Sequence, residues 1–279
     1  MSGRLVLVGT PIGNLGDLSP RAVEALTTAD TIACEDTRRT RALLSHLGLP
    51  GGRRLLAVHD HNEAVKVADV LDRLDKGESV VVVTDAGMPG ISDPGERLVA
   101  AAAAANHPVE VVPGPSAMVA ALVVSGLPAG RFCFEGFLPR KGAARARRLA
   151  EVAADSRTTV IFEAPPRVRQ TVADLAGAAG GDRRVAIVRE LTKVHEEVWR
   201  GTLAGAADHL ATKEPRGEYV VVLNGAPPPL PAGEEAVEAA LQAHLDAGVD
   251  KRTAVAAVTT ALSVPKRVVY DMALDLWSR

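Results

Sequence analysis

Short runs of aliphatic and β-branched residues alternate with longer helical segments over the first half of this chain. The clearest run, at 80–84, is apolar until its last residue, which is typical of a strand buried on both faces. Further strands are predicted at 5–8, 31–34, 55–59 and 109–112, and helices at 19–29, 63–75, 96–105 and 116–125. Ser19 and Gly126 mark a helix start and a helix end. Because strands that alternate with helices form parallel sheets covered on both faces, the pattern constrains the chain to an α/β fold.

A second block with the same alternation follows, and then the pattern changes. Its strands are predicted at 133–135, 159–162, 185–188 and 219–223. The stretch APPPLPAGEE that comes next predicts a stiff linker, and no strand signal follows it. We therefore predict two α/β domains, a proline-rich linker and a small helical domain, at 1–115, 116–225, 226–235 and 236–279.

The helical domain has the outline of a helix-turn-helix. One helix is predicted over 252–262, a turn at Ser263, and a second helix from Pro265. Lys266 and Arg267 lie in the first turn of that second helix, where they are candidate RNA contacts. Since any helical hairpin can imitate this outline, we interpret it as an accessory RNA or ribosome contact and not as the head of a transcription factor.

The composition indicates a cytoplasmic globular protein. The chain has 279 residues, of which 47% are hydrophobic and 24% charged, and its net charge is −2, so a nucleic-acid contact would depend on local basic patches. No stretch approaches the roughly 18 apolar residues of a membrane span, and the run at 5–8 is too short for a signal peptide. Cys34 and Cys133 stand far apart and outside any zinc-binding spacing, which is typical of a reducing compartment and argues against a disulfide.

Three loops rich in glycine and proline follow predicted strands. They are GTPIGN at 9–14, DAGMPGISDPG at 85–95 and PGPSA at 113–117. Since the carboxyl ends of parallel strands share one edge of the sheet, the loops predict a ligand site there, although each alone could be an ordinary turn. GTPIGN lacks the GK[ST] ending of a P-loop and the GxGxxG spacing of a dinucleotide-binding loop.

The loop residues favour a zwitterionic nucleoside as the ligand. Glycine lets backbone groups approach closely, and the helix that Ser116 would cap offers amides to a carboxylate or phosphate. Asp85, at a strand end, can accept hydrogen bonds from a ribose or an amino group. No lysine stands in the three loops, which disfavours a triphosphate. S-adenosylmethionine carries a matching carboxylate, ammonium and nucleoside.

Seven stretches of the chain resemble one enzyme family. In order, between residues 4 and about 225, they are VGTPIGNLGDLSPRA, ACEDTRRT, HDHNE, TDAGMPGISDPG, PGPSA, FEGFLPRKG and RELTKVHEE. Together they resemble the ribosomal RNA small subunit methyltransferase I family, within the tetrapyrrole-methylase-like superfamily. The resemblance implies two α/β domains with S-adenosylmethionine in the cleft between them, and a homodimer. It also implies 2′-O-methylation of a cytidine in the decoding region of 16S rRNA.

The resemblance assigns cofactor-binding roles residue by residue. These fall on Pro11, Gly13, Asp85, Ala86, Gly87, Ile91, Ser116, Ala117, Phe162 and Glu163. The last two open FEAPPR, where the family usually reads YESPHR, so Phe162, Ala164 and Pro166 depart from its pattern. The departure argues against proton transfer by a phenol or an imidazole there, whereas Arg167 is retained. Arg216 replaces a lysine that is common in the family, and we expect little effect.

Methyl transfer from a sulfonium requires alignment, exclusion of water and help in deprotonating the hydroxyl. Candidate proton acceptors follow the second strand and lie in RELTKVHEE, and we rank four first: Glu35, Asp36, Glu190 and Lys193. Glu196 and Glu197 are further candidates. A solvated or ion-paired charged face is the competing interpretation, and no base is assigned among them. The reaction requires no metal.

His59 and His61 in HDHNE lie two apart, on one face of a predicted strand, where they could hold a metal. No third ligand stands at a diagnostic spacing, so the metal signal is weak. The resemblance makes HDHNE a family motif that lines the cleft or the dimer contact.

One segment supplies five basic side chains that could bind RNA phosphates. PRKGAARARR at 139–148 contains Arg140, Lys141, Arg145, Arg147 and Arg148. On a helix, Lys141, Arg145 and Arg148 share a face, so we predict that this segment binds 16S rRNA or the small ribosomal subunit. Aromatic residues make up only 3% of the chain, which argues against stacking of many bases.

Two other functions stay open at this point. A methyltransferase of the same superfamily could act on a tetrapyrrole or another small substrate. A regulator without enzymatic activity could sense a ligand through the α/β domains and bind nucleic acid through its tail. The basic segment and the helical tail favour RNA over a tetrapyrrole.

Overall fold

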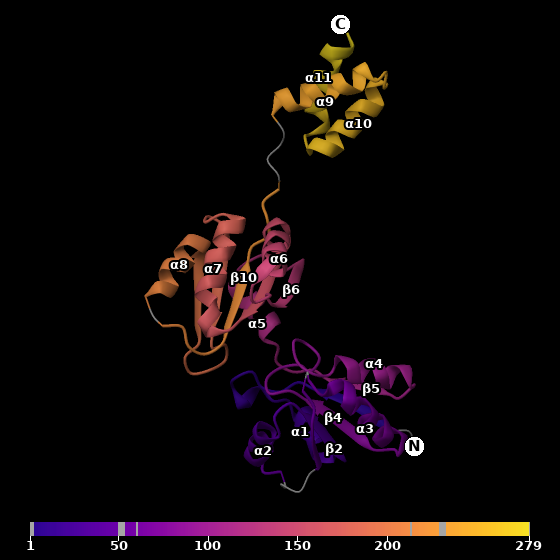
Figure 1. Ribbon diagram of the computed structural model, residues 1–279, viewed down its shortest axis with the longest axis vertical. Helices are drawn as coiled ribbons and strands as arrows, with labels where there is room; N and C mark the ends of the chain where they lie inside the picture. Colours follow the sequence, from indigo (N-terminus) through magenta and orange to yellow (C-terminus); the bar gives the residue numbers. More distant parts are fainter. Residues whose placement is uncertain (1–2, 50–53, 60, 213, 229–232, 279) are drawn as a thin grey trace. The chain divides into compact units, whose positions relative to one another are not determined.

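The structure is a computed structural model that describes residues 3–49, 54–59, 61–212, 214–228 and 233–278. The chain divides into two compact units, Met1–Ala226 and Pro227–Arg279. The first unit contains two sheets with helices, whereas the described part of the second unit contains helices only (Figure 1).

The first sheet is parallel throughout. Its strands stand in the order β3-β2-β4-β1-β5, and each printed pairing between them is parallel. The prediction of a parallel sheet is therefore confirmed for this half. In chain order its elements are β1 (Arg4–Val8), a 3-10 helix (Leu15–Asp17), α1 (Pro20–Thr28), β2 (Thr31–Cys34), α2 (Thr37–His46), β3 (Arg54–Ala57), α3 (Glu63–Asp75), β4 (Ser79–Val83), α4 (Glu96–Ala104) and β5 (Val109–Val112).

Apolar side chains hold helices against both faces of the first sheet. On one face, Val6 and Val81 pack with residues of α1 and α2. On the other face, Leu5 and Val80 pack with residues of α3 and α4. Successive side chains of a strand point to opposite faces, so burial on both sides explains the continuous apolar run in β4. Ser19 caps α1, as predicted.

The second sheet is mixed, with the strand order β6-β7-β10-β8-β9. β6 and β7 pair in parallel, whereas β7 with β10, β10 with β8, and β8 with β9 pair antiparallel. Gly126 ends α5 with a φ of 72°, as predicted. The elements are α5 (Ala117–Ser125), β6 (Phe132–Phe137), α6 (Gly142–Ala154), β7 (Thr158–Glu163), α7 (Pro165–Ala179), β8 (Arg184–Arg189), β9 (Glu197–Thr202), α8 (Leu203–Ala211) and β10 (Tyr219–Leu223).

The edge strand β9 is not among the predicted strands. The sequence analysis treated its first residue, Glu197, as part of a charged motif. At the edge of the sheet, Val198 and Trp199 are each only half-buried and pack toward different cores. The sequence of β9 therefore shows neither the apolar–polar alternation of a strand buried on one face nor the continuous apolar run of a strand buried on both faces.

Helices also cover both faces of the second sheet. Ile161 and Val221 face the core formed with α6, α7 and α8, which Figure 1 labels beside this sheet. Val160 and Val220 face the opposite core, which contains α5. Ile12, from the loop that follows β1, belongs to this second core, so the two halves of the first unit share apolar packing.

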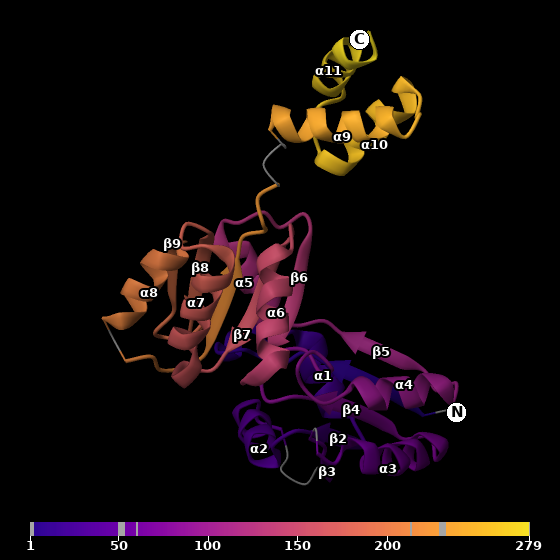
Figure 2. The ribbon, with the colours of Figure 1, turned by 45° about the horizontal axis from the view of Figure 1, so that its top comes forward.

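The second unit is a cluster of three helices in its described part (Figure 2). They are α9 (Glu234–Asp246), α10 (Lys251–Leu262) and α11 (Lys266–Trp277). Ser263 adopts a left-handed φ of 52° between α10 and α11, which confirms the predicted turn. The predicted linker at 226–235 ends earlier, because α9 begins at Glu234; residues 229–232 of it lie outside the described residues. None of the described helices has both the length and the apolar character needed to cross a membrane.

Candidate active site

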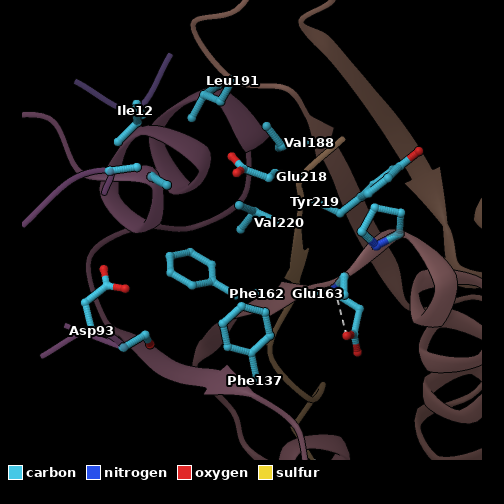
Figure 3. A pocket seen from close by; sticks show the side chains of 15 residues that line it. Ile12, Asp93, Phe137, Phe162, Glu163, Val188, Leu191, Glu218, Tyr219 and Val220 are labelled. Atoms are coloured by element: carbon cyan, nitrogen blue, oxygen red, sulfur yellow. Dashed lines mark hydrogen bonds between the residues drawn. The ribbon is translucent and has the colours of Figure 1, made fainter. Parts of the chain in front are cut away.

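Loops of the first sheet and strands of the second enclose a cavity of about 310 Å³ (Figure 3). We call the segments that follow β1, β4 and β5 the β1 loop (9–14), the β4 loop (84–95) and the β5 loop (113–116). The first half contributes Ile12, Ala86, Ser92 and Asp93 to the wall, and the second half contributes Ala117, Phe137, Phe162, Glu163, Ala164, Pro165, Val188, Leu191, Glu218, Tyr219 and Val220. The size and the mainly apolar wall are typical of a small-molecule site.

Backbone contacts join the three loops. The N–H of Thr10 donates to the carbonyl of Gly87 at 2.9 Å, and the N–H of Gly87 donates to the carbonyl of Thr10 at 3.1 Å. Gly87 has a φ of +91°, a conformation that favours glycine. A Cβ on Gly9 would lie 2.7 Å from the backbone of Gly114. The β1 and β5 loops can therefore approach this closely only because both of these positions are glycine. The glycines thus let the loops approach one another.

Two polar side chains, Thr84 and Asp85, stand at the end of β4. The hydroxyl of Thr84 is buried and has no hydrogen-bond partner in the described part of the chain. The carboxylate of Asp85 accepts the N–H of Asp36 at 3.2 Å and lies 3.4 Å from Nε of Arg39. Asp85 is therefore held in place from the β2 side, beside a hydroxyl that can still donate.

The predicted cofactor residues fall into two groups. Ala86, Ala117, Phe162 and Glu163 lie on the cavity wall, whereas the wall does not include Pro11, Gly13, Asp85, Gly87, Ile91 or Ser116. Ser116 precedes α5, but its side chain makes no capping hydrogen bond, which corrects the predicted cap. Gly13 faces the second half of the unit, where a Cβ would collide with Lys193. Val188 and Val220 are wall residues that the sequence analysis missed, since the inward face of a strand is known only once the sheet is known.

HDHNE holds the far end of the β4 loop through its last residue. Glu63, the first residue of α3, is buried, and its carboxylate accepts the N–H groups of Gly95, Arg97 and Leu98 at 2.9, 3.0 and 3.3 Å. A carboxylate at this position satisfies the free amides of α4 and suits its dipole. The sequence analysis missed this role because the partners stand more than thirty positions apart.

The two histidines of HDHNE do not lie on a strand, because β3 ends at Ala57. This corrects the predicted placement of His59 and His61, whose ring centroids are 6.1 Å apart. Within the described residues, no group of three His, Cys, Asp or Glu side chains is placed to hold a metal ion. Asp60 lies outside the described residues.

Aromatic rings form one side of the cavity. The centroids of Phe137 and Phe162 are 5.8 Å apart with the rings at 65°, an edge-to-face arrangement. Phe134 supports Phe162 from behind at 4.9 Å. Figure 3 shows the two wall rings side by side, with Asp93 across the cavity. Phe162 is half-buried, whereas Phe137 is 55% exposed.

A buried polar network stands behind the rings. Glu163 accepts the hydroxyl of Thr171 at 2.6 Å, and Nε of Arg167 lies 3.2 Å from its carboxylate. Thr171 in turn accepts an N–H of Arg145 at 3.0 Å. In Figure 3 the carboxylate of Glu163 points away from the rings. Its charge is therefore satisfied within the protein framework and not offered to the cavity.

Arg145 corrects the predicted RNA-binding surface. Its side chain is only 9% exposed, and its guanidinium lies 2.6 Å from Asp174 and donates to the carbonyl of Pro139 at 3.0 Å. The reason is helical periodicity: α6 places Arg145 on the same buried face as Leu149 and Val152. An arginine held in this way is not available to phosphates.

The other predicted RNA-binding side chains are exposed. Those of the first unit are Arg140, Lys141, Arg147 and Arg148, and those of α11 are Lys266 and Arg267. Arg148 lies 3.0 Å from Glu151 and 3.4 Å from Glu135, and Arg147 lies 3.9 Å from Glu151. Arg140 and Lys141 immediately follow Phe137–Pro139 and stand ahead of α6, so Lys141 does not share a helical face with the others.

The predicted bases Glu190 and Lys193 form a cluster with Glu218. Nζ of Lys193 lies 2.8 Å from Glu190 and 2.9 Å from Glu218. Burial alone would lower the pKa of Lys193, but its contacts with the two carboxylates raise it. Burial alone would raise the pKa of Glu190, but Lys193 and a main-chain N–H lower it. The Thr192 hydroxyl accepts the N–H of Asn14 at 3.2 Å, so this cluster lies where the two halves meet. A proton acceptor needs the opposite shift at Lys193.

Asp36 caps α2 instead of standing free. Its carboxylate accepts the N–H of Arg38 at 2.8 Å and pairs with the Arg38 guanidinium at 2.8 Å. The hydrogen bonds from the Arg38 side chain and backbone hold the pKa of Asp36 far below its usual range. Glu35, half-buried beside it, does not lie on the cavity wall.

The fold and the two-sided cavity define a class of methyltransferases. The family model of Tetrapyrrole (Corrin/Porphyrin) Methylases matches residues 4–207. The crystal structure of the methyltransferase CobJ has a TM-score of 0.61 at 20% identity and covers 81% of this chain and 95% of that one. Uroporphyrin-III C-methyltransferase from Thermus thermophilus, complexed with S-adenosylhomocysteine, has a TM-score of 0.57 at 22% identity, over 80% of this chain and 97% of that one. These structures share the fold.

Relatives that match nearly the whole chain identify its family within this class of methyltransferases. A protein from Mycobacterium tuberculosis is 48% identical over 275 residues, which cover 98% of this chain and 95% of that protein. A protein from Synechocystis is 42% identical over 276 residues, 98% of each chain. Both are named ribosomal RNA small subunit methyltransferase I. The chain belongs to this family of the tetrapyrrole methylases.

Proposed function

We propose that the chain is an S-adenosylmethionine-dependent methyltransferase that modifies the 2′-oxygen of a cytidine ribose in the decoding region of 16S rRNA. The observation that carries this proposal is the 48% identity, over 98% of the chain, with a ribosomal RNA small subunit methyltransferase I. The cavity at the carboxyl edge of the parallel sheet supplies a site for the reaction. Action on ribosomal RNA supports a cytoplasmic location for the enzyme.

The residues of the site fit S-adenosylmethionine. The hydroxyl of Thr84 and the carboxylate of Asp85 stand directly before the wall residue Ala86 in the chain, and Phe162 gives the wall an apolar face. Asp93 and Glu218 bring negative charge to the wall, which suits a cationic sulfonium. When bound, this cofactor supplies a methyl group that is already activated. The protein must hold the ribose in line with it and exclude water.

We assign the proton acceptor to the carboxylates on the cavity wall. Three acidic residues stand there among the described residues, and Glu163 is turned toward its buried network. Asp93 and Glu218, of which Glu218 is ion-paired with Lys193, are the other two wall carboxylates, and we propose these two as candidates. Lys193 is held in its charged form, and Asp36 is a poor base because its pKa is lowered. Replacement of Asp93 by Asn or of Glu218 by Gln should reduce kcat more than KM.

Exposed cations next to the cavity support binding of RNA. Arg140 and Lys141 follow the aromatic wall strand β6, and Lys266 and Arg267 add a second basic site on α11. Replacing Arg140 and Lys141 by alanine should weaken RNA binding and reduce the slope of log affinity against log salt by about 2. Binding of S-adenosylmethionine should not change.

The helical unit is an accessory to this activity. A ribosomal RNA small subunit methyltransferase I from Thermotoga maritima matches over 223 residues, which are 99% of that protein but 80% of this chain. That relative therefore has no counterpart for about a fifth of this chain. We propose that the helical unit adds affinity for the RNA or the ribosomal subunit.

A homodimer is part of the proposal. Val111, on the edge strand β5, is 54% exposed, and Val119 and Val123 on α5 are 46% and 70% exposed. Apolar side chains in such positions suit an interface with a second copy of the chain. Val123→Glu should lower the sedimentation coefficient to that of a monomer if this surface is the interface.

The decisive experiment follows labelled methyl groups from S-adenosylmethionine into three substrates: small ribosomal subunits, naked 16S rRNA and a tetrapyrrole. Label in a cytidine ribose of either RNA substrate supports the proposal. The shared fold makes tetrapyrrole methylation the second candidate, and label in the tetrapyrrole would favour it. Nucleic-acid binding without any transfer would favour a regulator.

A further inference from the structure

We propose that Phe137 is the platform on which the base of the target nucleotide stacks while its ribose is methylated. The inference rests on the proposed function, because it concerns how an RNA substrate enters the same cavity. It adds a substrate-binding residue that belongs to neither the predicted cofactor set nor the basic segment. Phe137 ends β6, at the point where the chain leaves the second sheet.

The distribution of aromatic side chains singles out this residue. The chain has four Phe, two Tyr and two Trp, all of them within the described residues. Of these eight, Phe132, Phe137 and Tyr270 are exposed by more than a third, at 36%, 55% and 44%. Only Phe137 of these three also lies on the described cavity wall. A chain poor in aromatic residues therefore presents one accessible ring at its site.

The ring is exposed, but Phe137 pairs with Phe162 between β6 and β7, and side chains hold the backbone that follows it. The carbonyl of Leu138 accepts a guanidinium N–H of Arg167 at 2.7 Å, and the carbonyl of Pro139 accepts one from Arg145 at 3.0 Å. The edge of the neighbouring ring, Phe162, fixes one side. A ring that is already positioned loses little conformational entropy when a ligand covers it. The buried Arg145 and the half-buried Arg167 thus fix the chain directly after the platform.

Charge next to the ring fits a nucleotide in particular. Arg140 and Lys141 are exposed two and three residues after Leu138. An aromatic ring for the base beside cations for the phosphates is the usual combination in proteins that bind unpaired RNA. The base, and not the cofactor, is the better occupant of a ring at the exposed rim, because the half-buried Phe162 lies deeper.

The small size of the cavity explains why a stacking surface on the protein would help the substrate to bind. A space of about 310 Å³ is too small for an RNA helix. The target nucleotide must therefore leave its stack, which weakens binding. Stacking on a protein ring typically strengthens binding by about 10- to 100-fold per base, so Phe137 would offset much of that loss.

The test compares Phe137→Ala and Phe137→Trp with Phe132→Ala, a matched control on the other end of β6. KM for small ribosomal subunits is measured by methyl transfer, and the Kd of S-adenosylmethionine by calorimetry. We expect Phe137→Ala to raise KM by about 10- to 100-fold, since one stacked base contributes that much. The Kd of the cofactor should change less than about twofold, and Phe137→Trp and Phe132→Ala should behave like wild type.

Three results would overturn the inference. If Phe137→Ala raises the cofactor Kd and leaves the RNA KM unchanged, the ring belongs to the cofactor site. If the variant sediments as a smaller species than wild type, the ring belongs to an interface between copies. If neither constant changes, the ring has no role in binding. Failure of the proposed function itself is distinguishable, because wild-type protein would then transfer no methyl group to either RNA substrate.

Discussion

The two sides of the cavity differ in whether backbone or side-chain contacts hold them together. On the side of the first sheet, backbone dominates: paired main-chain groups join Thr10 to Gly87, and Gly9 meets Gly114 without room for a Cβ. On the side of the second sheet, side chains dominate, with two phenylalanines in front of a buried network of charged groups. Strand direction explains part of the contrast. Parallel strands bring several loops to one edge, whereas the second sheet presents the face of its strands.

This contrast teaches that the two sides should fail in different ways. A backbone-built wall is sensitive to an added side chain, because a Cβ changes the allowed dihedral angles or fills the space between loops. A wall built from side chains is sensitive to truncation, because a cavity or an unpaired charge remains.

The largest effect is expected from the buried charge behind the second wall. Arg145→Met leaves Asp174 without its cationic partner and removes the support of the Pro139 carbonyl, so the free energy of unfolding should fall by about 3 kcal/mol. Arg147→Met, on the exposed face of the same helix, should change it by less than about 0.5 kcal/mol. Urea denaturation measures both. Equal effects of the two variants would contradict the structural role of Arg145.

The loop framework on the first side of the cavity is tested at Gly87, which joins the β4 loop to the β1 loop but does not itself lie on the wall. A valine at a φ of +91° is strained by about 1–3 kcal/mol, and relief of that strain should displace the β4 loop. We expect the affinity for S-adenosylmethionine to fall by roughly 100-fold in calorimetry. Gly180→Val is the matched control, since Gly180 has a φ of 88° in open space at the end of α7. It should lose stability but keep its affinity, and normal binding by Gly87→Val would show that the β4 loop does not hold the cofactor.

Truncation of Phe162 tests the side-chain wall. Phe162→Ala removes an apolar face, and we expect S-adenosylmethionine to bind about 10-fold more weakly, which corresponds to ~1.4 kcal/mol. Phe162→Tyr should bind like wild type, because tyrosine is the usual residue of the family here. Titration calorimetry with both variants separates loss of the ring from loss of an edge contact. A Tyr variant as weak as the Ala variant would count against this wall as the cofactor site.

The smallest effect concerns the charged cluster where the two sides meet. The folded-state pKa of Glu190 lies below its unfolded value of about 4.3, so its contribution is present above that pH and is lost as pH falls through the folded pKa. The pKa of Lys193 is raised above about 10.4, so its contribution is lost only as pH rises through the folded value.

The difference in unfolding free energy between wild type and Glu190→Gln should therefore be flat, at about 1 kcal/mol, between roughly pH 6 and 9. It should begin to shrink near pH 4, where the unfolded state takes up a proton first, and it should be lost below the folded pKa, where the carboxylate is protonated in both states. Glu214→Gln, at an exposed position, serves as the control. A difference that grows toward acid pH would show that the cluster does not stabilise the fold.

Much of the architecture and part of the site can be predicted from the sequence. The α3 and β5 bounds are as predicted, since a clear helical period and a short β-branched run define them locally. The three loops at one sheet edge follow from parallel pairing, and Ala86, Ala117 and Phe162 on the wall follow from the family resemblance. Edge strand β9 and the antiparallel setting of β10 do not follow, because strand direction depends on partners distant in the chain.

The sequence by itself determined the alternation of strands and helices in the first sheet, the edge at which the loops gather and the family to which the chain belongs, because each depends on local pattern or on long motifs. Only the tertiary structure decided which charged residues serve the framework. Arg145 lies inside because its helical face meets α7, and Glu63 caps a helix that begins more than thirty residues later. Local sequence does not predict such pairs, because the free energy of a buried charge depends on partners that only folding brings together.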